Sequence, residues 1–320
     1  MPKRRERVVR HVLADGSIKD YRYPVGPARR KRKAGDTLGD LIAAWQSSPE
    51  WKALAPKTQA NYSTYIRPLM HMQHVQASRI ERKQIIAIRN AMAEAKGNGA
   101  STGVVRAASA LFGWGLENGW LTTIPTLKMK RLKGGHLPAW TQREADLAIA
   151  KLVDHLRRAV VLALYTGQRR SDLIRMPWSA YDGRVIRLTQ KKTTTPLVIP
   201  VHPALKVELD TWKQDRVVGT TILANKFGRP WQDSNLSKQL GDALAKIEGF
   251  PAGKNIHGLR KLAAVNLAQC GCSLHEIGAI TGHKSLAMIQ LYTAAVDQER
   301  LAEAAIIRLS DARTAKTENA

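Results

Sequence analysis

The sequence predicts a mainly α-helical protein with a small β component, divided into two domains that are flanked by extensions. Apolar residues recur at helical spacing through most of the chain from Thr37 onward. Residues 183–201 differ, because they form two strand-like runs around a polar turn. The length of 320 residues also exceeds that of a typical single domain, so we expect two domains.

The charge of the chain indicates a polyanionic partner. It holds 51 lysines and arginines against 26 aspartates and glutamates, which gives a formal net charge of +25. Each phosphate that a cationic side chain neutralises releases condensed counterions, so nucleic acid is the first candidate and an anionic membrane the second. No apolar stretch is long enough to span a bilayer, and no signal-peptide core follows the basic N-terminus. We therefore expect a cytoplasmic protein, associated with the nucleoid when bound to DNA.

The cysteines give no sign of a disulfide or a metal site. Cys270 and Cys272 are separated by one residue, which is too close for an easy disulfide. Two cysteines alone do not make a zinc site. We expect small buried residues on a helix, and no metal or cofactor.

Residues 1–35 form a basic N-terminal arm. Within it, β-branched and aromatic residues flank Asp15-Gly16, which predicts a short β-hairpin. A basic cluster follows, which is either a solvated linker or a strip that contacts phosphates. This cluster consists of Arg29, Arg30, Lys31, Arg32 and Lys33.

Residues 36–125 predict a small bundle of four helices. Pro56 occupies the first turn of the second helix, the third helix spans 77–95, and Gly97 separates it from the fourth. Helices joined by such short connections pack as a bundle. Basic side chains recur through it, so we expect one face to lie on DNA, with Lys57 as a candidate contact.

A linker separates the bundle from a second domain. Residues 126–138 are basic, contain a glycine pair and end in proline, which is typical of a linker. The second domain, 139–300, opens with a capping-box signature at Thr141. Residues 301–320 form a C-terminal helix or tail, and an amphipathic helix is expected over 297–309. That helix docks either on its own domain or on a neighbouring subunit.

Four short segments of the second domain carry reactive residue types. Taken singly, each has a plain structural interpretation: a surface ion pair, a solvated turn, a polar helix face and a packed tyrosine. Their order and spacing together indicate one catalytic set. The segments are Tyr165-Thr166-Gly167-Gln168-Arg169-Arg170-Ser171-Asp172-Leu173, then Lys191-Lys192, then His257-Gly258-Leu259-Arg260, and finally Gly282-His283-Lys284-Ser285 with the later Tyr292.

In this order the segments resemble the tyrosine recombinase (phage integrase) family, over roughly residues 37–300. The resemblance implies that residues 36–125 are the family's helical core-binding (SAM-like) domain and that 139–300 are its mixed α/β catalytic domain. It also implies a role for each motif residue. By resemblance, Tyr292 is the nucleophile, Arg169 and Arg260 are the catalytic arginines, Lys192 is the catalytic lysine, His257 and His283 are the two histidines, and Asp172 is a supporting acid.

Two neighbours make these assignments ambiguous. Arg170 adjoins Arg169, but the spacing from the preceding Thr-Gly pair favours Arg169. Lys191 adjoins Lys192, but the distance to the end of the second strand favours Lys192. Three threonines follow Lys192 where the family often has a glycine, which leaves the shape of this turn open.

These residue types suit the cleavage of a phosphodiester. Two arginines offer planar, permanently charged donors to the oxygens on which negative charge develops. A tyrosine in water has a pKa of about 10, so a nearby histidine is needed to accept its proton. A lysine can return a proton to the departing 5′ oxygen. The covalent phosphotyrosine conserves the bond energy, so rejoining requires neither ATP nor a metal.

The sequence therefore predicts a site-specific DNA recombinase that integrates or excises a phage or mobile element through a 3′-phosphotyrosyl intermediate. The resemblance implies a homotetramer on two double-stranded DNA attachment sites, with the two domains on opposite faces of a duplex. Host DNA-bending and excision proteins are expected accessory partners. One alternative is type IB topoisomerase-like DNA relaxation, which the small helical domain disfavours. A non-catalytic DNA-binding protein is the other, and the complete set of reactive residues argues against it.

Overall fold

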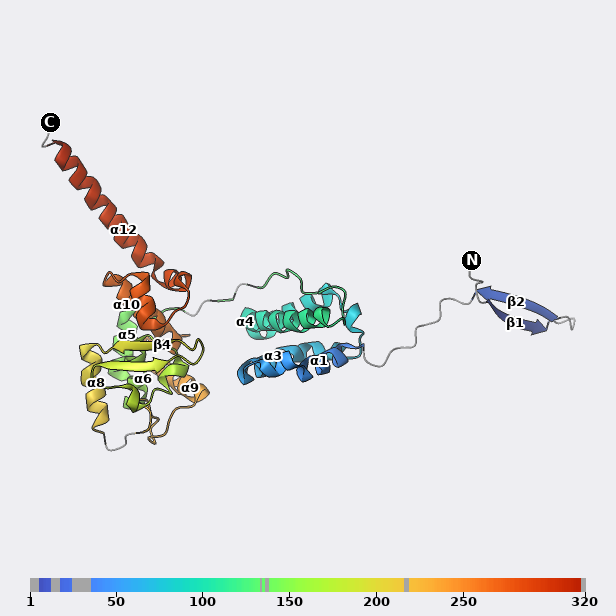
Figure 1. Cartoon of the computed structure of the whole chain (residues 1–320), viewed down its shortest axis with the longest axis horizontal. Coiled ribbons are helices and arrows are strands. Elements are labelled where there is room, and N and C mark those ends of the chain that lie inside the picture. Colours follow the sequence, from blue (N-terminus) through green and yellow to red (C-terminus); the bar gives the residue numbers. More distant parts are fainter. Residues whose placement is uncertain are drawn as a thin grey trace. The chain divides into compact units, whose positions relative to one another are not determined.

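The computed structural model describes residues 6–12, 18–24, 36–132, 134–135, 138–215 and 219–317. The chain divides into two compact units, residues 1–135 and 136–320 (Figure 1). No described helix is both long enough and apolar enough to cross a membrane.

The first unit begins with a two-stranded antiparallel sheet. Strand β1 (Glu6–Val12) pairs with β2 (Ile18–Pro24), and Val12 lies opposite Ile18. The expected Asp15-Gly16 turn lies outside the described residues. The same holds for the proposed phosphate-contacting cluster, Arg29, Arg30, Lys31, Arg32 and Lys33.

Local sequence signals explain where the helices of the first unit begin. Thr37 caps α1 by accepting from the backbone N–H of Asp40, whose carboxylate accepts from Thr37 in return. The third predicted helix was placed to start too early. Residues 77–79 form a single 3-10 turn, and the long helix starts only after Glu81, which caps it. The helices are α1 (Leu38–Ser47), α2 (Pro49–Ala53), α3 (Pro56–Ile66) and α4 (Arg82–Glu117), which is interrupted at Gly97.

An apolar core joins these helices. Leu41 of α1 and Phe112 of α4 are completely buried, and Trp45 packs edge-on against Trp51 with ring centroids 4.7 Å apart. Each such side chain contributes roughly 1.5–3 kcal/mol when it is removed from water. Figure 1 shows α1 and α3 beside α4. Lys57 is exposed near the start of α3.

The second unit is a helical body with one β-hairpin. Its first helix begins where the sequence predicted, because Thr141 and Glu144 form the expected capping box. In the hairpin, the buried Ile186 lies opposite Ile199. The elements are α5 (Gln142–Lys151), α6 (Asp154–Thr166), α7 (Arg170–Leu173), β3 (Val185–Thr189), β4 (Pro196–Pro200), α8 (Pro203–Lys213), α9 (Asp233–Leu244), α10 (Ile256–Gln269), α11 (Leu274–Thr281) and α12 (Leu286–Thr317).

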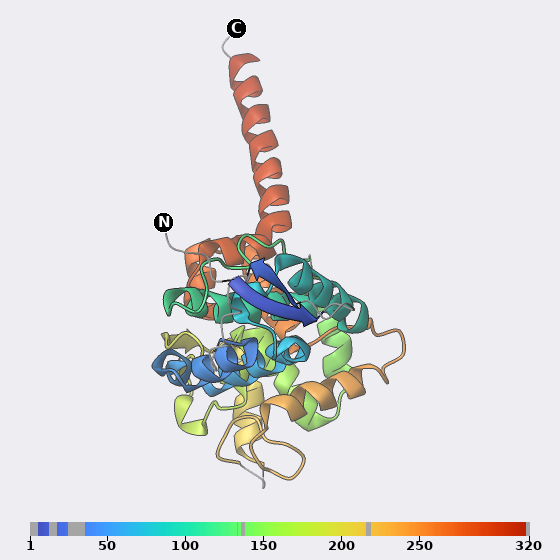
Figure 2. The ribbon, with the colours of Figure 1, turned by 90° about the vertical axis from the view of Figure 1, so that its right-hand side faces the viewer.

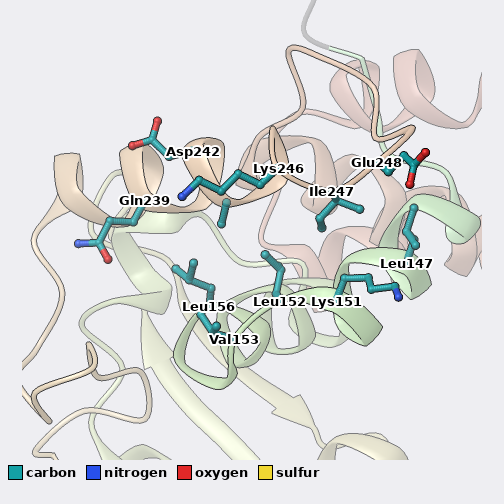
Figure 3. A pocket seen from close by; sticks show the side chains of 11 residues that line it. Leu147, Lys151, Leu152, Val153, Leu156, Gln239, Asp242, Lys246, Ile247 and Glu248 are labelled. Carbon is teal, nitrogen blue, oxygen red and sulfur yellow. The ribbon is translucent and has the colours of Figure 1, made fainter.

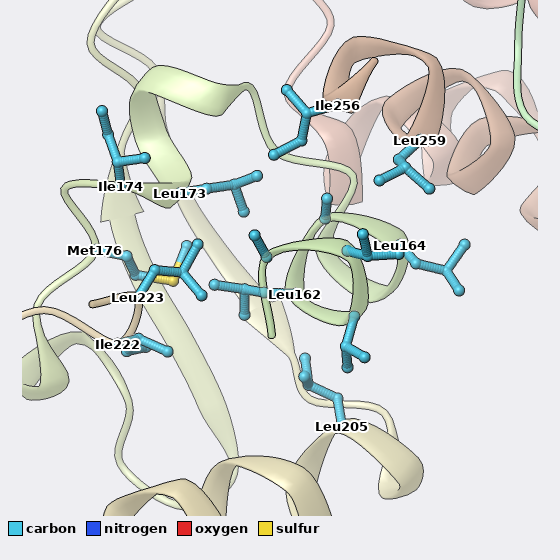
Figure 4. Close-up of a cluster of buried hydrophobic side chains, with 14 of the residues drawn as sticks. Leu162, Leu164, Leu173, Ile174, Met176, Leu205, Ile222, Leu223, Ile256 and Leu259 are labelled. Atoms are coloured by element: carbon cyan, nitrogen blue, oxygen red, sulfur yellow. The ribbon is translucent and has the colours of Figure 1, made fainter. Parts of the chain in front are cut away.

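Helix α6 is central to the core of the second unit. Leu162 of α6 lies among Leu173, Leu205 of α8 and Leu259 of α10, all fully or almost fully buried (Figure 4). Two of the four candidate segments lie at the end of α6 and at the start of α10, so the core holds these two on rigid elements.

Two expectations about the C-terminal part need correction. The helix expected over 297–309 is the middle of α12, a single helix that starts before Tyr292 and extends beyond the body of the unit (Figures 1 and 2). The sequence contains no glycine or proline between residues 286 and 317 that would interrupt it. The cysteines are not both buried on a helix. Cys270 is exposed at the end of α10, and Cys272 is half-buried beyond it.

Candidate active site

The turn after α6 directs Arg169 and Arg170 to different places. Gly167 ends α6 with φ of 61°, in the left-handed region that favours glycine. Beyond it, Nη1 of Arg169 donates to Oε1 of Gln190 at 2.5 Å. Nη1 of Arg170 instead donates to the hydroxyl of Ser237 on α9. Arg169 therefore contacts the hairpin turn, whereas Arg170 is hydrogen-bonded to α9.

The hairpin turn carries the two lysines. The backbone N–H of Lys191 donates to Oδ1 of the buried Asp172 at 2.9 Å, which anchors the turn. Lys192 is exposed, and its charge is one of those that lower the pKa of His257. Thr194 adopts φ of 51°, so a β-branched residue holds a left-handed conformation that normally favours glycine.

Arg260 is a buried cation at the bottom of the site, with 1% of its surface exposed. Its Nη1 donates to the backbone carbonyls of Gly167 (2.8 Å) and Thr281 (2.6 Å), and its Nε donates to Nε2 of His283 (3.2 Å). Its Nη2 has no hydrogen-bond partner among the described residues. Burial and the charge of Arg169 lower the pKa of Arg260 to about 9, so the guanidinium stays charged at neutral pH.

Hydrogen bonds assign one tautomer to His283. Its Nε2 accepts from Arg260, and its Nδ1 lies 2.8 Å from the hydroxyl of Thr281. That hydroxyl donates its own hydrogen to the carbonyl of Ile277 at 2.7 Å, so Nδ1 must carry the proton. Burial, then Arg260 and Arg169, lower the pKa of His283 to about 3, and the ring is neutral.

His257 lies at the start of α10. The side chain of Asn255 caps this helix by accepting from the backbone N–H groups of His257 and Gly258. The side chain of His257 still reaches solvent, but partial burial and the charge of Arg260 lower its pKa. Gly258 is required by packing, because a Cβ there would lie 2.6 Å from the Trp140 ring.

Tyr292 projects from α12 next to these groups and is half-buried. Its ring is T-shaped to that of His283, with centroids 5.9 Å apart. Nζ of Lys261 lies 5.2 Å from the Tyr292 ring centroid, within the range of a cation–π interaction. Tyr292 in its ionised form would raise the pKa of Arg260, so the phenol lies within range of that cation's charge. The phenol is thus surrounded by cations and a neutral imidazole.

The structure brings most of the sequence-predicted residues together. Arg169, His257, Arg260, His283 and Tyr292 form one cluster, with Lys192 on the adjoining turn and Asp172 beneath it. Lys57 belongs to the other unit.

Three residues in the cluster were missed in the sequence: Gln190, Lys261 and Thr281. Each is the immediate neighbour of a motif residue in the sequence, and that adjacency is the signal that was available.

Two other features of the second unit were compared with this cluster: groups of metal-binding residue types and a cavity. Among the described residues, no group of three or more His, Cys, Asp or Glu is arranged to hold a metal ion. A cavity of about 800 Å³ lies between α9 and the α5–α6 segment, where Leu152 and Leu156 face Lys246 (Figure 3). Its walls contain none of the clustered residues, so the reactive groups and the cavity are separate features.

Residues 143–299 match the model of the phage integrase family. These residues form a domain of the phage integrase family of tyrosine recombinases. The integrase of Escherichia phage HK022 is 29% identical over 273 residues, covering 80% of this chain and 75% of that protein. Tyrosine recombinase XerC of Mycobacterium leprae is 28% identical over 260 residues, covering 74% of this recombinase and 87% of its relative.

Solved structures show the same fold. A lambda integrase dimer bound to a COC′ core site matches with a TM-score of 0.70 and 25% identity, covering 80% of this recombinase and 95% of that chain. A lambda integrase tetramer bound to a Holliday junction matches with a TM-score of 0.73 at 21% identity, covering 88% and 94%. The fold is thus that of an integrase, mainly helical with a small sheet in the second unit.

Proposed function

We propose that this site-specific recombinase cuts and rejoins double-stranded DNA through a covalent 3′-phosphotyrosyl link to Tyr292. The observation that carries the proposal is the clustering of Tyr292 with two arginines and a neutral histidine. A phosphodiester is anionic, and this cluster offers it cationic donors beside a nucleophile. The names of the relatives, integrase and XerC recombinase, support the same activity.

Each reacting group has a defined task in the proposed step. The phenolic oxygen of Tyr292 attacks phosphorus while the bond from phosphorus to the 5′ oxygen breaks. Arg169 and the unpartnered Nη2 of Arg260 donate to the non-bridging oxygens, where negative charge grows in the transition state. Because the donors are fixed by the surrounding hydrogen bonds, little reorganisation is needed at the moment of reaction.

Protons are handled by the remaining groups. We assign the return of a proton to the departing 5′ oxygen to Lys192, which lies on an exposed turn from which it can reach a bound strand. The Nε2 lone pair of His283 already accepts from Arg260, which suits that ring to holding the arginine. The neutral His257, with its side chain open to solvent, is the better placed of the two to take up the proton that Tyr292 loses as it attacks, and we assign it that task.

We further propose that the biological outcome is the integration or excision of a phage or mobile element by a tetramer of this chain. A lambda integrase tetramer has been solved on a Holliday junction, which supports strand exchange between two synapsed attachment sites. On the far part of α12, Ile306 and Ile307 are exposed by 63% and 60%, and such apolar residues suit docking on another subunit. Host DNA-bending and excision proteins are proposed accessory partners, and the cytoplasm is the proposed compartment.

One substitution tests the chemistry. Tyr292→Phe should bind attachment-site DNA normally and form no covalent complex on denaturing gels, because only the attacking oxygen is removed. Covalent trapping by that variant would contradict the assignment. An assay with two sites on one circular DNA separates the alternatives. A recombinase yields resolved or inverted products, whereas a type IB topoisomerase-like enzyme only relaxes the circle.

We propose that residues 1–35 act as a DNA-binding arm for sites flanking the crossover. The antiparallel β1–β2 pair, of a size that fits a groove, supports this role. The basic cluster from Arg29 to Lys33 supplies further charge, and we also assign a phosphate contact to the exposed Lys57. A chain that starts at Thr37 should protect and cleave the crossover site but lose discrete footprints at flanking sites. If the whole 320-residue chain gives no footprint at flanking sites, residues 1–35 are only a charged tail.

A further inference from the structure

Gln190 is a completely buried amide at the centre of the site, and the motif analysis did not include it. Its Oε1 accepts from Nη1 of Arg169 at 2.5 Å and from the hydroxyl of Thr193 at 2.8 Å. Its Nε2 donates to Oε1 of Gln168 at 2.7 Å and to the carbonyl of Thr281 at 2.8 Å. A glutamine amide has two donor hydrogens and two acceptor lone pairs, so all of its capacity is used.

The orientation of this amide is settled by its partners. If nitrogen and oxygen were exchanged, the amide hydrogens would face the guanidinium of Arg169, and the oxygen would face the carbonyl of Thr281. Both contacts would be repulsive. The arrangement seen is therefore the only one of the two that satisfies every group, and a carboxylate at this position cannot reproduce it.

The amide joins three segments that are distant in sequence. Thr281, its partner at the end of α11, also accepts from Arg260 through the same carbonyl and holds His283 through its hydroxyl. On the other side, the backbone of Gln190 closes the hairpin turn, with its carbonyl accepting from Thr194 at 2.8 Å. Gln190 thus contacts the guanidinium of Arg169 and the turn that carries Lys192. Through Thr281 it is also connected to the Arg260–His283 pair.

The Gln190 amide is packed tightly against the backbone at Gly282. A Cβ on Gly282, which follows Thr281, would lie 2.4 Å from Nε2 of Gln190, closer than real Cβ contacts come. Gly282 also has φ of 72°, a conformation that other residues rarely adopt. Glycine at 282 therefore allows the amide to approach the chain.

We infer that Gln190 is a positioning residue, which sets the guanidinium of Arg169 and the Lys192 turn relative to Arg260 and His283. The inference rests on the proposed function, since it concerns how that reaction's donors are aimed. Removal of the amide leaves the charge of Arg169 in place but frees its orientation. A displacement of about 1 Å in a catalytic group costs about 100-fold in rate, so the effect should fall on the chemical step and not on DNA binding.

Single-turnover cleavage of a suicide DNA substrate, monitored as covalent complex, tests this inference. We expect Gln190→Ala to lower the cleavage rate by about 100-fold with DNA affinity unchanged. Gln190→Glu should be at least as slow, because its carboxylate pairs with Arg169 and faces the carbonyl of Thr281. Gln190→Met, which fills the same volume without hydrogen bonds, is the second variant in case the alanine form unfolds. Ile186→Val, a small core change on the strand that ends just before Gln190, is the control and should keep the wild-type rate.

A double-mutant cycle separates positioning from mere structural support. If Gln190 acts largely through Arg169, the double variant Arg169→Ala, Gln190→Ala should lose clearly less activity than the product of the two single losses. Fully additive losses, or a wild-type rate in Gln190→Ala, would overturn the inference. A wild-type protein that forms no covalent complex at all would instead overturn the proposed function, so the two failures are distinguishable.

Discussion

The neutral His283 makes the stability of the second unit depend on pH in a defined way. Its pKa is about 3 in the folded protein, against 6.5 for an unperturbed histidine. Below pH 6.5 the unfolded chain binds a proton at this position, while the folded chain does not. The sign follows from linkage: a state that binds more protons gains stability as pH falls, so acid favours unfolding. The window for this loss runs from pH 6.5 down to about 3.

The magnitude follows from the width of that window. One pKa unit corresponds to about 1.36 kcal/mol. At pH 5, 1.5 units below the ordinary value, His283 should therefore reduce the free energy of unfolding by about 2 kcal/mol relative to pH 8. At pH 5 the folded ring is still neutral, because its pKa is about 3. Its own protonation therefore does not yet offset the loss of about 2 kcal/mol. Solvent access to the half-buried ring reduces the loss but does not change its sign.

Urea unfolding of the full chain at pH 8 and pH 5 measures this effect. His283→Gln is the informative variant, because a neutral amide can accept from Arg260 and donate to Thr281 without titrating in this range. The difference in unfolding free energy between the two pH values should be about 2 kcal/mol smaller in the variant than in the wild type. His275→Gln, which removes an exposed histidine of α11, is the matched control. Equal pH dependence in His283→Gln and wild type would refute the neutral, desolvated ring.

Three further predictions concern other residues. Arg169→Ala or Arg260→Ala should lower the cleavage rate by about 10²–10³-fold with little loss of DNA affinity. Lysine at either position should restore little of that rate. Equal losses of binding and cleavage would show that the arginines only bind phosphate. Lys192→Ala should recover cleavage on DNA with sulfur as the bridging 5′ atom, which leaves without a proton, and no recovery would assign Lys192 another role. Gly258→Ala should lower the free energy of unfolding by about 1–3 kcal/mol, because the added Cβ would clash with the Trp140 ring. An unchanged melting temperature would contradict that contact.

The sequence was sufficient to predict the fold class and to identify the motif residues that the structure clusters. Helical periodicity, the capping box at Thr141 and the strand pair around Lys192 depend on residues close together in the chain. Such local signals reflect hydrogen bonds and burial that each element makes largely on its own. The order of the motifs then indicated which residues belong to one site, because that order resembles the order in one family.

The contacts that orient the site were not predictable in this way. The choice between Arg169 and Arg170 depends on which side chain finds Gln190 and which finds Ser237, a residue of α9 far along the chain. The pairing of Gln190 with Thr281 likewise joins segments whose proximity only the packed core determines. Long-range hydrogen bonds made by polar side chains leave no periodic pattern in a sequence.

The two glycines that border the site have a consequence for how this protein can change over evolutionary time. A Cβ on Gly167 would lie 2.9 Å from the Thr281 side chain, as one on Gly282 would press on Gln190. Each glycine is therefore half of a matched pair whose other member comes from a distant segment. Because both glycines also have positive φ, of 61° and 72°, shrinking the neighbour alone does not permit a side chain at either position. Alignments of close homologues should therefore show glycine retained at both positions, although neither is a reacting group.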